Sequence, residues 1–205
     1  MVQQTSRDGS QQIAGLLVAG DTFGRPFSQP EPYAIKAASD AILCCFSNGT
    51  LELLMTRYPE LEHHLYLSCL DQLDTTRDWM IILGGQSVTE RIASFFLFLG
   101  QRQDFLTAVP SMAGSCRYID VPISRQVMAA FLGTTVESIS RTVHLMADAS
   151  IIKIHSSSRF EIRDRYRLIE MSGAEDLDFG QTRSLWTDTT RPGQNRQAAG
   201  RRSRA

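Results

Sequence analysis

The spacing of hydrophobic residues changes twice along the chain, and the changes divide it into three stretches. In residues 1–58 the apolar residues form short runs separated by glycine and proline, which is typical of short strands joined by turns. In residues 59–84 they recur at alternating steps of four and three, which predicts one long helix. In residues 85–171 helical spacing gives way near the end to two short strand-like runs. The pattern therefore predicts an α+β chain.

The first stretch is predicted to be an incomplete all-β unit. Asp8-Gly9 is a strong hairpin signal, and residues 11–18, 33–38 and 41–46 have the length of strands. So few strands cannot close a barrel or bury a two-sided core. We therefore expect that the domain begins earlier and that this chain carries an N-terminal truncation or a late start codon.

The long helix of residues 59–84 is predicted to pair two copies of the chain. It follows a short helix expected at residues 50–56, and Gly84-Gly85 ends it. One side carries the spacing of a coiled-coil seam. The seam consists of Leu61, Leu65, Ser68, Gln72, Thr75, Trp79 and Ile82. A second stripe, made of Leu67, Leu70, Leu73 and Ile81, is expected to pack on the β unit. The alternative is an ordinary core helix of a single chain.

Residues 121–147 are predicted to form two helices joined by a tight turn. Ser124 can cap the first helix, Gly133 can make the turn, and Thr135 can cap the second helix. The buried side of the second helix is expected to consist of Ile139, Val143 and Met146.

The opposite side of the second helix carries side chains suited to the edges of DNA bases. Glu137 can accept a hydrogen bond from the amino group of cytosine, and Arg141 can bind guanine through two hydrogen bonds. Ser140 can serve either role, and Val136 can contact the methyl group of thymine. The alternative is a helical hairpin in which Glu137 and Arg141 form a solvated pair of little energy.

A predicted β-hairpin follows, with strands at 151–154 and 160–162 joined by a polar turn. Such a hairpin can act as a wing that contacts DNA phosphates, and His155 in its turn can take part. The alternative is a hairpin that is merely solvated. The expected phosphate contacts are Ser124, Arg125, Thr135, Lys153 and Arg159. A short last helix is expected at 164–171. Residues 172–205 are predicted to form a disordered basic tail that either adds nonspecific DNA affinity or has no role.

Composition narrows the class of protein. The chain has 205 residues, of which 42% are hydrophobic and 21% charged, so a globular protein is expected. Its longest apolar runs fall far short of the roughly 20 residues that span a bilayer, and its polar start is unlike a signal peptide. We therefore expect a cytoplasmic protein with no membrane partner. The net charge of −1 gives no general attraction to nucleic acid, so DNA affinity must come from local charge.

The sequence does not predict an enzyme. No nucleophile, base and orienting residue are suggested at matching positions, and residues 20–24 lack the lysine of a phosphate-binding loop.

Several short motifs resemble those of one family. They are Gly-Asp-Thr-Phe-Gly at 20–24, Leu-Gly at 83–84, Glu-Arg-Ile-Ala-Ser-Phe at 90–95, Ser-Arg-Gln at 124–126 and Val-Glu-Ser-Ile-Ser-Arg at 136–141. With the order of β unit, long helix, hinge and winged helix-turn-helix, they resemble the CRP/FNR family of bacterial transcription regulators over residues 7–171. The last motif resembles the FNR and FixK branch.

The resemblance implies a sensor domain with a cyclic-nucleotide-binding-like β-roll, here partial and confined to residues 1–58. It implies a dimerisation helix at 59–84, a winged helix-turn-helix domain at 85–171 and the tail at 172–205. It also implies a homodimer that binds double-stranded DNA at TTGAT-type palindromic half-sites, with RNA polymerase as a further partner. The base-reading residues of that homodimer would be Val136, Glu137, Ser140 and Arg141.

The expected ligand differs from that of the cyclic-nucleotide branch. Arg25 stands where that branch has a glutamate, and residues 33–37 lack its arginine-serine pair, so cyclic AMP is not expected. Cys44 resembles the internal one of the four cysteines that hold a [4Fe-4S] cluster in oxygen-sensing FNR proteins. The other three would lie in an N-terminal cysteine cluster that this chain does not contain.

This chain alone is therefore not expected to bind a cofactor, although a full-length parent could hold the cluster. The alternative for Cys44 is a buried small hydrophobic residue. The remaining cysteines, Cys45, Cys69 and Cys116, form no Cys-x-x-Cys pair and are expected to be buried or free thiols.

We therefore expect a dimeric DNA-binding transcription regulator that controls oxygen- or redox-responsive genes. The alternative is a truncated partner that does not bind DNA and forms a heterodimer with a full-length relative. Ser150 follows the second helix where the family usually has glycine, and a left-handed conformation there would cost about 1 kcal/mol.

Overall fold

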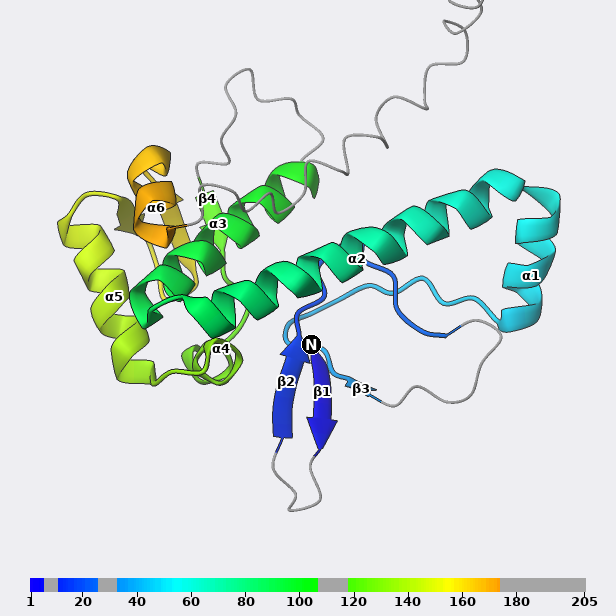
Figure 1. The fold of residues 1–205 in the computed structure, drawn as a ribbon, viewed down its shortest axis with the longest axis horizontal. Helices are drawn as coiled ribbons and strands as arrows, with labels where there is room; N and C mark the ends of the chain where they lie inside the picture. The colour runs from blue at the N-terminus through cyan, green and yellow to red at the C-terminus, as the bar shows by residue number, and fades with distance from the viewer. Residues whose placement is uncertain (6–10, 26–32, 107–117, 174–205) are drawn as a thin grey trace, which may run out of the picture.

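The computed structural model describes residues 1–5, 11–25, 33–106 and 118–173. The predictions for the turn at Asp8-Gly9, for Cys116 and for nearly all of the tail therefore lie outside the described residues. In Figure 1 one long helix, α2, crosses the molecule, with the small N-terminal sheet below its middle in this view. The C-terminal helices and strands gather around one end of α2, and a short helix, α1, lies at the other end.

The N-terminal part forms one three-stranded antiparallel sheet in the order β2-β1-β3. Its strands are β1 (Val2–Thr5), β2 (Gln11–Gly15) and β3 (Ala34–Ile35). Two of the predicted strands are confirmed in shortened form, whereas β1 was not predicted because it holds little apolar alternation. The strand predicted at 41–46 is wrong: this segment is unpaired in the described part of the chain, and Ile42 is 99% exposed. Its apolar residues predicted a strand, but a strand also needs a partner.

The two predicted helices that follow are present. Helix α1 (Asn48–Arg57) is capped by the hydroxyl of Ser47, which accepts a hydrogen bond from the backbone N–H of Thr50 at 3.2 Å. Helix α2 (Pro59–Gly85) has 27 residues and carries proline in its first turn, where the missing N–H costs nothing. No helix in the described ranges is both long and apolar enough to cross a membrane.

The C-terminal part packs four helices around a second antiparallel sheet in the order β4-β6-β5. Its elements are α3 (Val88–Leu106), β4 (Tyr118–Asp120), α4 (Arg125–Leu132), α5 (Val136–Asp148), β5 (Ile152–Ile154), β6 (Arg159–Ile162) and α6 (Arg165–Ser172). The helices and the β5–β6 hairpin confirm the predicted elements. Strand β4 was not predicted, since three residues are too few to show a period.

The core of the C-terminal part is aromatic and includes the end of α2. Phe96 of α3 packs edge to face on Phe160 of β6, with ring centroids 5.0 Å apart. The indole of Trp79 on α2 lies 5.2 Å from the ring of Phe98 and 4.7 Å from that of Phe131 on α4. All five rings are buried. The end of α2 is therefore packed into the same core as the domain that follows it.

The predicted dimer seam lies on the inward face of α2. Ser68, Trp79 and Ile82 are buried within their own chain. The side-chain amide of Gln72 donates a hydrogen bond to the carbonyl oxygen of Thr22 at 2.8 Å, and the hydroxyl of Thr75 accepts one at 2.9 Å from Arg102. Leu61 and Leu65 are partly exposed. The central and C-terminal residues of the seam thus contact their own chain, and the pairing of this seam with a second copy stays a prediction.

The second stripe of α2, which was expected to pack on the β unit, faces outward instead. Leu70, Leu73 and Ile81 are exposed, and only Leu67 is half-buried. Steps of four and three mark an apolar face of a helix, but they do not tell which neighbour covers it. The packing of this stripe on the β unit is therefore wrong for Leu70, Leu73 and Ile81.

Candidate nucleic-acid interface

The first helix of the predicted pair, α4, has a serine as its N-cap and a glycine as its C-cap. The hydroxyl of Ser124 accepts a hydrogen bond from the backbone N–H of Val127 at 3.2 Å, as predicted for an N-cap. Gly133 ends the helix in the left-handed conformation, at φ 62°. Glycine adopts this conformation without the strain of a Cβ, so the turn to α5 is tight.

The second helix, α5, is fixed to the core along one side. Thr135 caps it by accepting a hydrogen bond from the backbone N–H of Ser138 at 3.2 Å. Ile139, Val143 and Met146 are buried, as the sequence predicted, and Thr142 is buried beside them. Because this side is packed against the domain, the orientation of the opposite side is fixed.

The opposite side of α5 displays the predicted base-reading residues. Glu137 and Arg141 are exposed, and Val136 and Ser140 are half-buried at the edge of the packed side. His144 is also exposed and lies one helical turn beyond Ser140. The base-reading residues predicted from the sequence do not include His144, although its spacing of four from Ser140 places it on the same side.

Glu137 lies in the first turn of α5, where it remains ionised. Its pKa is held below the ordinary value of a glutamate, chiefly by a hydrogen bond from its own backbone N–H. A hydrogen bond with the side chain of Thr135 lowers the pKa further, burial acts in the opposite direction, and the charge of Arg141 has the smallest effect, which also lowers the pKa. An ionised carboxylate can only accept hydrogen bonds, which suits the amino group of cytosine.

Arg91 positions the turn between the two helices. From α3 its Nε atom donates to the carbonyl oxygen of Gln86 at 2.9 Å, and its Nη1 atom donates to that of Leu132 at 3.1 Å. The same side chain thereby joins the junction of α2 and α3 to the end of α4. The sequence does not predict this role, because an arginine in an amphipathic helix carries no signal that distinguishes a carbonyl partner from solvent.

The hairpin of β5 and β6 forms the predicted wing beside α5. The hydroxyl of Ser156 closes its turn by accepting hydrogen bonds from the backbone N–H groups of Ser158 and Arg159, at 3.2 and 3.0 Å. At the base of the turn, His155 Nε2 lies 2.9 Å from a carboxylate oxygen of Glu161, whose side chain is buried. His155 is thus held against the wing itself.

The expected phosphate contacts differ in how firmly the fold holds them. Lys153 is exposed on β5. Arg159 is exposed too, but its guanidinium lies 3.6 Å from the carboxylate of Asp120 and 5.4 Å from the ring centroid of Tyr118. Arg125 lies over Phe160, and partial burial lowers its pKa from the ordinary value of arginine. Ser124 and Thr135 are the two helix caps described above.

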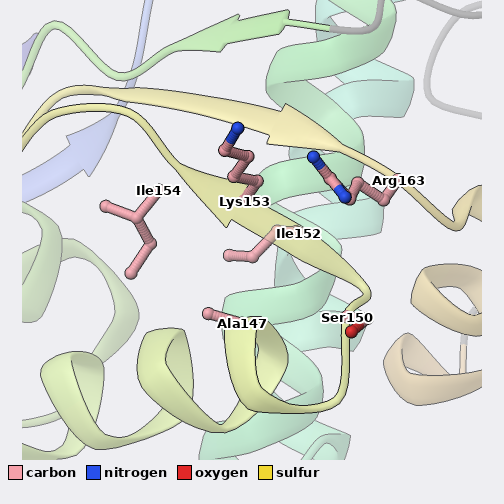
Figure 2. Close-up of a pocket in the computed structure, with 6 residues that line it drawn as sticks. All are labelled: Ala147, Ser150, Ile152, Lys153, Ile154 and Arg163. Carbon is pink, nitrogen blue, oxygen red and sulfur yellow. The ribbon is translucent and has the colours of Figure 1, made fainter.

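A shallow hollow separates the end of α5 from the edge strand of the wing (Figure 2). Its lining includes Ile152, Lys153 and Ile154 of β5, together with Arg163. Ala147 and Ser150 complete the lining. Ser150 has a φ of 58°, which is the left-handed conformation considered for this position from the sequence.

Three cysteines, Cys44, Cys45 and Cys69, lie in the described residues. Cys44, Cys45 and Cys69 are free and exposed, so the interpretation of Cys44 as a buried hydrophobic residue is wrong. Within the described ranges, no three or more residues among His, Cys, Asp and Glu are grouped so that they could hold a metal ion.

Two helices joined by a tight turn, with a two-stranded wing behind a polar helix face, define a winged helix-turn-helix DNA-binding domain. Residues 90–171 match the Crp-like helix-turn-helix domain family. The transcriptional activator protein FnrL of Cereibacter sphaeroides is 34% identical over 177 residues, which are 86% of this chain and 70% of that protein. The chain belongs to the CRP/FNR family of transcription regulators, in its FNR/FixK branch, and is a regulator rather than an enzyme.

Other relatives and solved structures agree with this assignment. A probable transcriptional activator of Rhizobium leguminosarum bv. viciae is 34% identical over 167 residues, 82% of this chain and 67% of that protein. The solved structure of FixK2 from Bradyrhizobium japonicum has a TM-score of 0.63 at 22% identity, covering 83% of this chain and 81% of that chain. This last similarity shows that the two proteins share a fold.

Proposed function

We propose that this chain binds palindromic DNA as a homodimer and reads TTGAT-type half-sites with α5. The observation that carries the proposal is the division of α5 into two sides. Ile139, Val143 and Met146 are buried, whereas Glu137 and Arg141 are exposed near the start of the helix. In helix-turn-helix proteins this end of the second helix enters the major groove.

Four side chains at this end supply the chemistry of base recognition. Arg141 can donate two hydrogen bonds to guanine, and the ionised Glu137 can accept one from cytosine. Ser140 and Val136, at the edge of the same side, can add a hydrogen bond and a contact with a thymine methyl group. The carboxylate of Glu137 thus suits cytosine and the guanidinium of Arg141 suits guanine, which are the two members of one base pair.

The phosphate contacts are proposed to flank this helix. The caps Ser124 and Thr135 place hydroxyl groups at the starts of α4 and α5, where the helix ends themselves attract anions. Positive charge comes from Lys153 and Arg159 on the wing and from Arg125 at the start of α4. The chain has a net charge of −1, so its attraction to DNA phosphates must come from such local charges.

The homodimer is proposed to form through the outward face of α2. Its exposed apolar residues are Tyr66, Leu70, Leu73, Met80 and Ile81, several of which recur at steps of three and four. Tyr66 is 61% exposed and Met80 is 70% exposed, so this face leaves a long apolar stripe without a neighbour in the described chain. A second copy of α2 would cover this stripe. The two helices would then pair as a coiled coil, through a face other than the seam predicted from the sequence.

Oxygen- or redox-responsive gene control is the regulatory role that we propose. Relatives of this chain include a nitrogen fixation regulation protein FixK of Azorhizobium caulinodans and an anaerobic regulatory protein of Pasteurella multocida. RNA polymerase is the proposed partner at the promoter, and the cytoplasm is the proposed location. A [4Fe-4S] cluster is proposed only for a longer parent chain, with Cys44 as one ligand.

A binding titration with a TTGAT palindrome tests the DNA-reading role. Arg141→Ala is expected to weaken binding by about 1 to 3 kcal/mol, because it removes a pair of hydrogen bonds to a base. Arg57→Ala is the matched control, since Arg57 is exposed at the far end of the molecule on α1. Equal affinities of wild type and Arg141→Ala would contradict the role. Failure of the wild type to bind at all would favour the heterodimer partner instead.

A further inference from the structure

The turn at residues 18–22 of the N-terminal unit is closed by the carboxylate of Asp21. The backbone N–H of Asp21 donates to the carbonyl oxygen of Val18 at 3.0 Å. In return, the backbone N–H of Val18 donates to Oδ2 of Asp21 at 2.8 Å. One carboxylate oxygen therefore fixes the turn and leaves the other to face the rest of the molecule.

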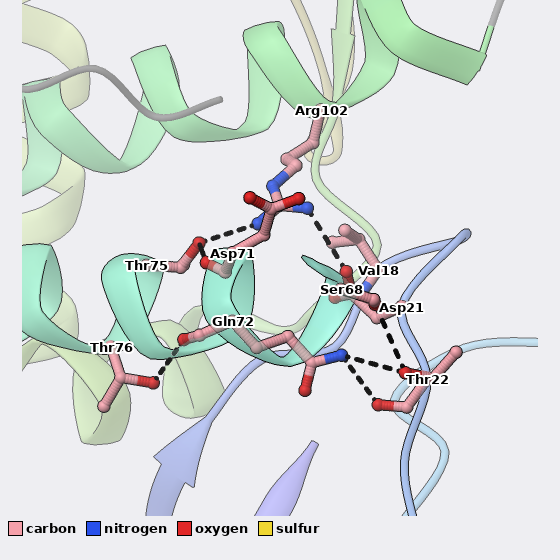
Figure 3. Close-up of polar contacts among 9 residues, drawn as sticks. All are labelled: Val18, Asp21, Thr22, Ser68, Asp71, Gln72, Thr75, Thr76 and Arg102. Atoms are coloured by element: carbon pink, nitrogen blue, oxygen red, sulfur yellow. Dashed lines mark hydrogen bonds and ion pairs between the residues drawn. The ribbon is translucent and has the colours of Figure 1, made fainter. Parts of the chain in front are cut away.

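The second oxygen of Asp21 meets an arginine from the DNA-binding domain (Figure 3). Nη1 of Arg102, on α3, lies 3.2 Å from Oδ1 of Asp21, and the two side chains are 6% and 4% exposed. Nη2 of Arg102 donates to the hydroxyl of Thr75 on α2 at 2.9 Å. Breaking a buried ion pair from one side is strongly destabilising, so Asp21 and Arg102 are held together, with Thr75 bonded to the same guanidinium.

The same turn is attached to α2 at two further points. The hydroxyls of Thr22 and Ser68 lie 3.3 Å apart, and the side-chain amide of Gln72 donates to the carbonyl oxygen of Thr22 at 2.8 Å. The turn is therefore bonded to α2 on one side and to α3 on the other. Three elements that are distant in the sequence meet at this cluster.

Arg102 holds the far end of α3, whereas other contacts hold its near end. At the near end, Arg91 bonds to Gln86, and Gln86 also bonds to Ser94, with donor–acceptor distances of 2.9 Å in both cases. Between these two ends, the ring of Phe98 on α3 packs against Trp79 of α2. Held at both ends, α3 keeps a fixed angle to α2, and the recognition helix moves with α3 because they share one core.

We propose that Asp21, Arg102 and Thr75 act as positioning residues that set the angle between the DNA-binding domain and α2. This inference rests on the proposed function, in which α2 pairs two copies. In such a dimer the angle fixes the separation of the two recognition helices, and so the spacing of the half-sites that bind best. These three residues affect the spacing of the half-sites, whereas α5 recognises the bases within each half-site.

The test compares palindromes whose half-sites differ in spacing by one base pair. Wild type is expected to prefer one spacing. Asp21→Asn keeps an oxygen to close the turn but removes the charge, so it is expected to reduce the preference by about fivefold or more. Thr75→Val removes only a hydroxyl and is expected to act in the same direction. The discrimination against base changes within a half-site is expected to stay at its wild-type value in both variants.

Asp40→Asn is the matched control, since Asp40 is exposed in the same N-terminal unit. An unchanged spacing preference in folded Asp21→Asn would overturn the inference, and Thr75→Val decides the question if Asp21→Asn does not fold. A loss of discrimination within the half-site as well would also overturn it, because the effect would then not concern spacing. Failure of the wild type to bind any palindrome would overturn the proposed function and this inference together.

Discussion

The rings of Trp79 and Phe131 lie nearly perpendicular, at 69°, with their centroids 4.7 Å apart. Trp79 belongs to the long helix α2, and Phe131 belongs to α4, the first helix of the helix-turn-helix. This contact joins two elements that the sequence predicts to belong to separate domains. It makes α2 part of the core of the DNA-binding domain as well as the proposed dimer helix.

Replacing Trp79 by alanine should therefore destabilise the whole C-terminal part. The cavity and the lost aromatic contacts are expected to lower the free energy of unfolding by about 3 to 5 kcal/mol, as measured by urea denaturation. Tyr166→Ala on α6 is the control, because that side chain is 87% exposed. Similar losses in the two variants would show that Trp79 does not occupy the core.

Replacing Ser150 by glycine should stabilise the protein. Ser150 has a φ of 58°. Its backbone N–H donates to the carbonyl oxygen of Ala147 at 2.9 Å, and that of Ile151 donates to the carbonyl oxygen of Met146 at 2.9 Å. These hydrogen bonds at the helix end require the left-handed conformation. Glycine adopts it without the strain of a side chain, so a gain of about 1 kcal/mol is expected in urea unfolding. Ser157→Gly, in the exposed turn of the wing, should give no gain. A loss of stability in Ser150→Gly would contradict this explanation.

Placing a charge on the outward face of α2 should weaken the proposed dimer. Met80→Asp and Leu73→Asp are each expected to cost about 2 kcal/mol of association free energy, roughly thirtyfold in Kd, because the carboxylate would be buried between two helices. Sedimentation velocity measures the change. Leu53→Asp on α1 is the control, since Leu53 is equally apolar and 68% exposed. Dimers of wild-type strength in both α2 variants would show that another face pairs the chains.

The titration of Glu137 should depend on the cap of its helix. Since its pKa is lowered in the folded chain, its contribution to stability is present above the pH at which unfolded glutamate titrates, about 4.3. That contribution is lost as the pH falls through the lower pKa of the folded state. Thr135→Val removes one of the hydrogen bonds and is expected to move the pKa of Glu137 upward, as measured by NMR titration of the carboxylate. An unchanged pKa would show that Thr135 does not contribute.

The helical part of the fold could be predicted because its signals are local. Ser124, Gly133 and Thr135 each act through the conformation of their own or adjacent residues, so their identity alone indicated the boundaries of α4 and α5. The buried side of α5 followed from spacing, and its exposed side followed by exclusion. These are properties that a single sequence contains.

The contacts between elements could not be predicted in the same way. The partner of Trp79 and Ile82 depends on how α2 folds back on the domain after it, and heptad spacing is equally compatible with a second chain. The pairing of Asp21 with Arg102 links residues far apart in the sequence, and neither residue type indicates its partner. The segment at 41–46 shows the same limit, because apolar residues favour a strand only where another strand is available.

The assignment of α5 as the DNA-reading helix predicts a specific change in base preference. Wild type and Arg141→Ala should be titrated against a TTGAT palindrome and against one in which the guanine of each half-site is replaced by adenine. Wild type is expected to lose affinity by about 1 to 3 kcal/mol per altered half-site, whereas Arg141→Ala should bind the two sequences nearly equally. Retention of the full preference for guanine in folded Arg141→Ala would contradict the assignment.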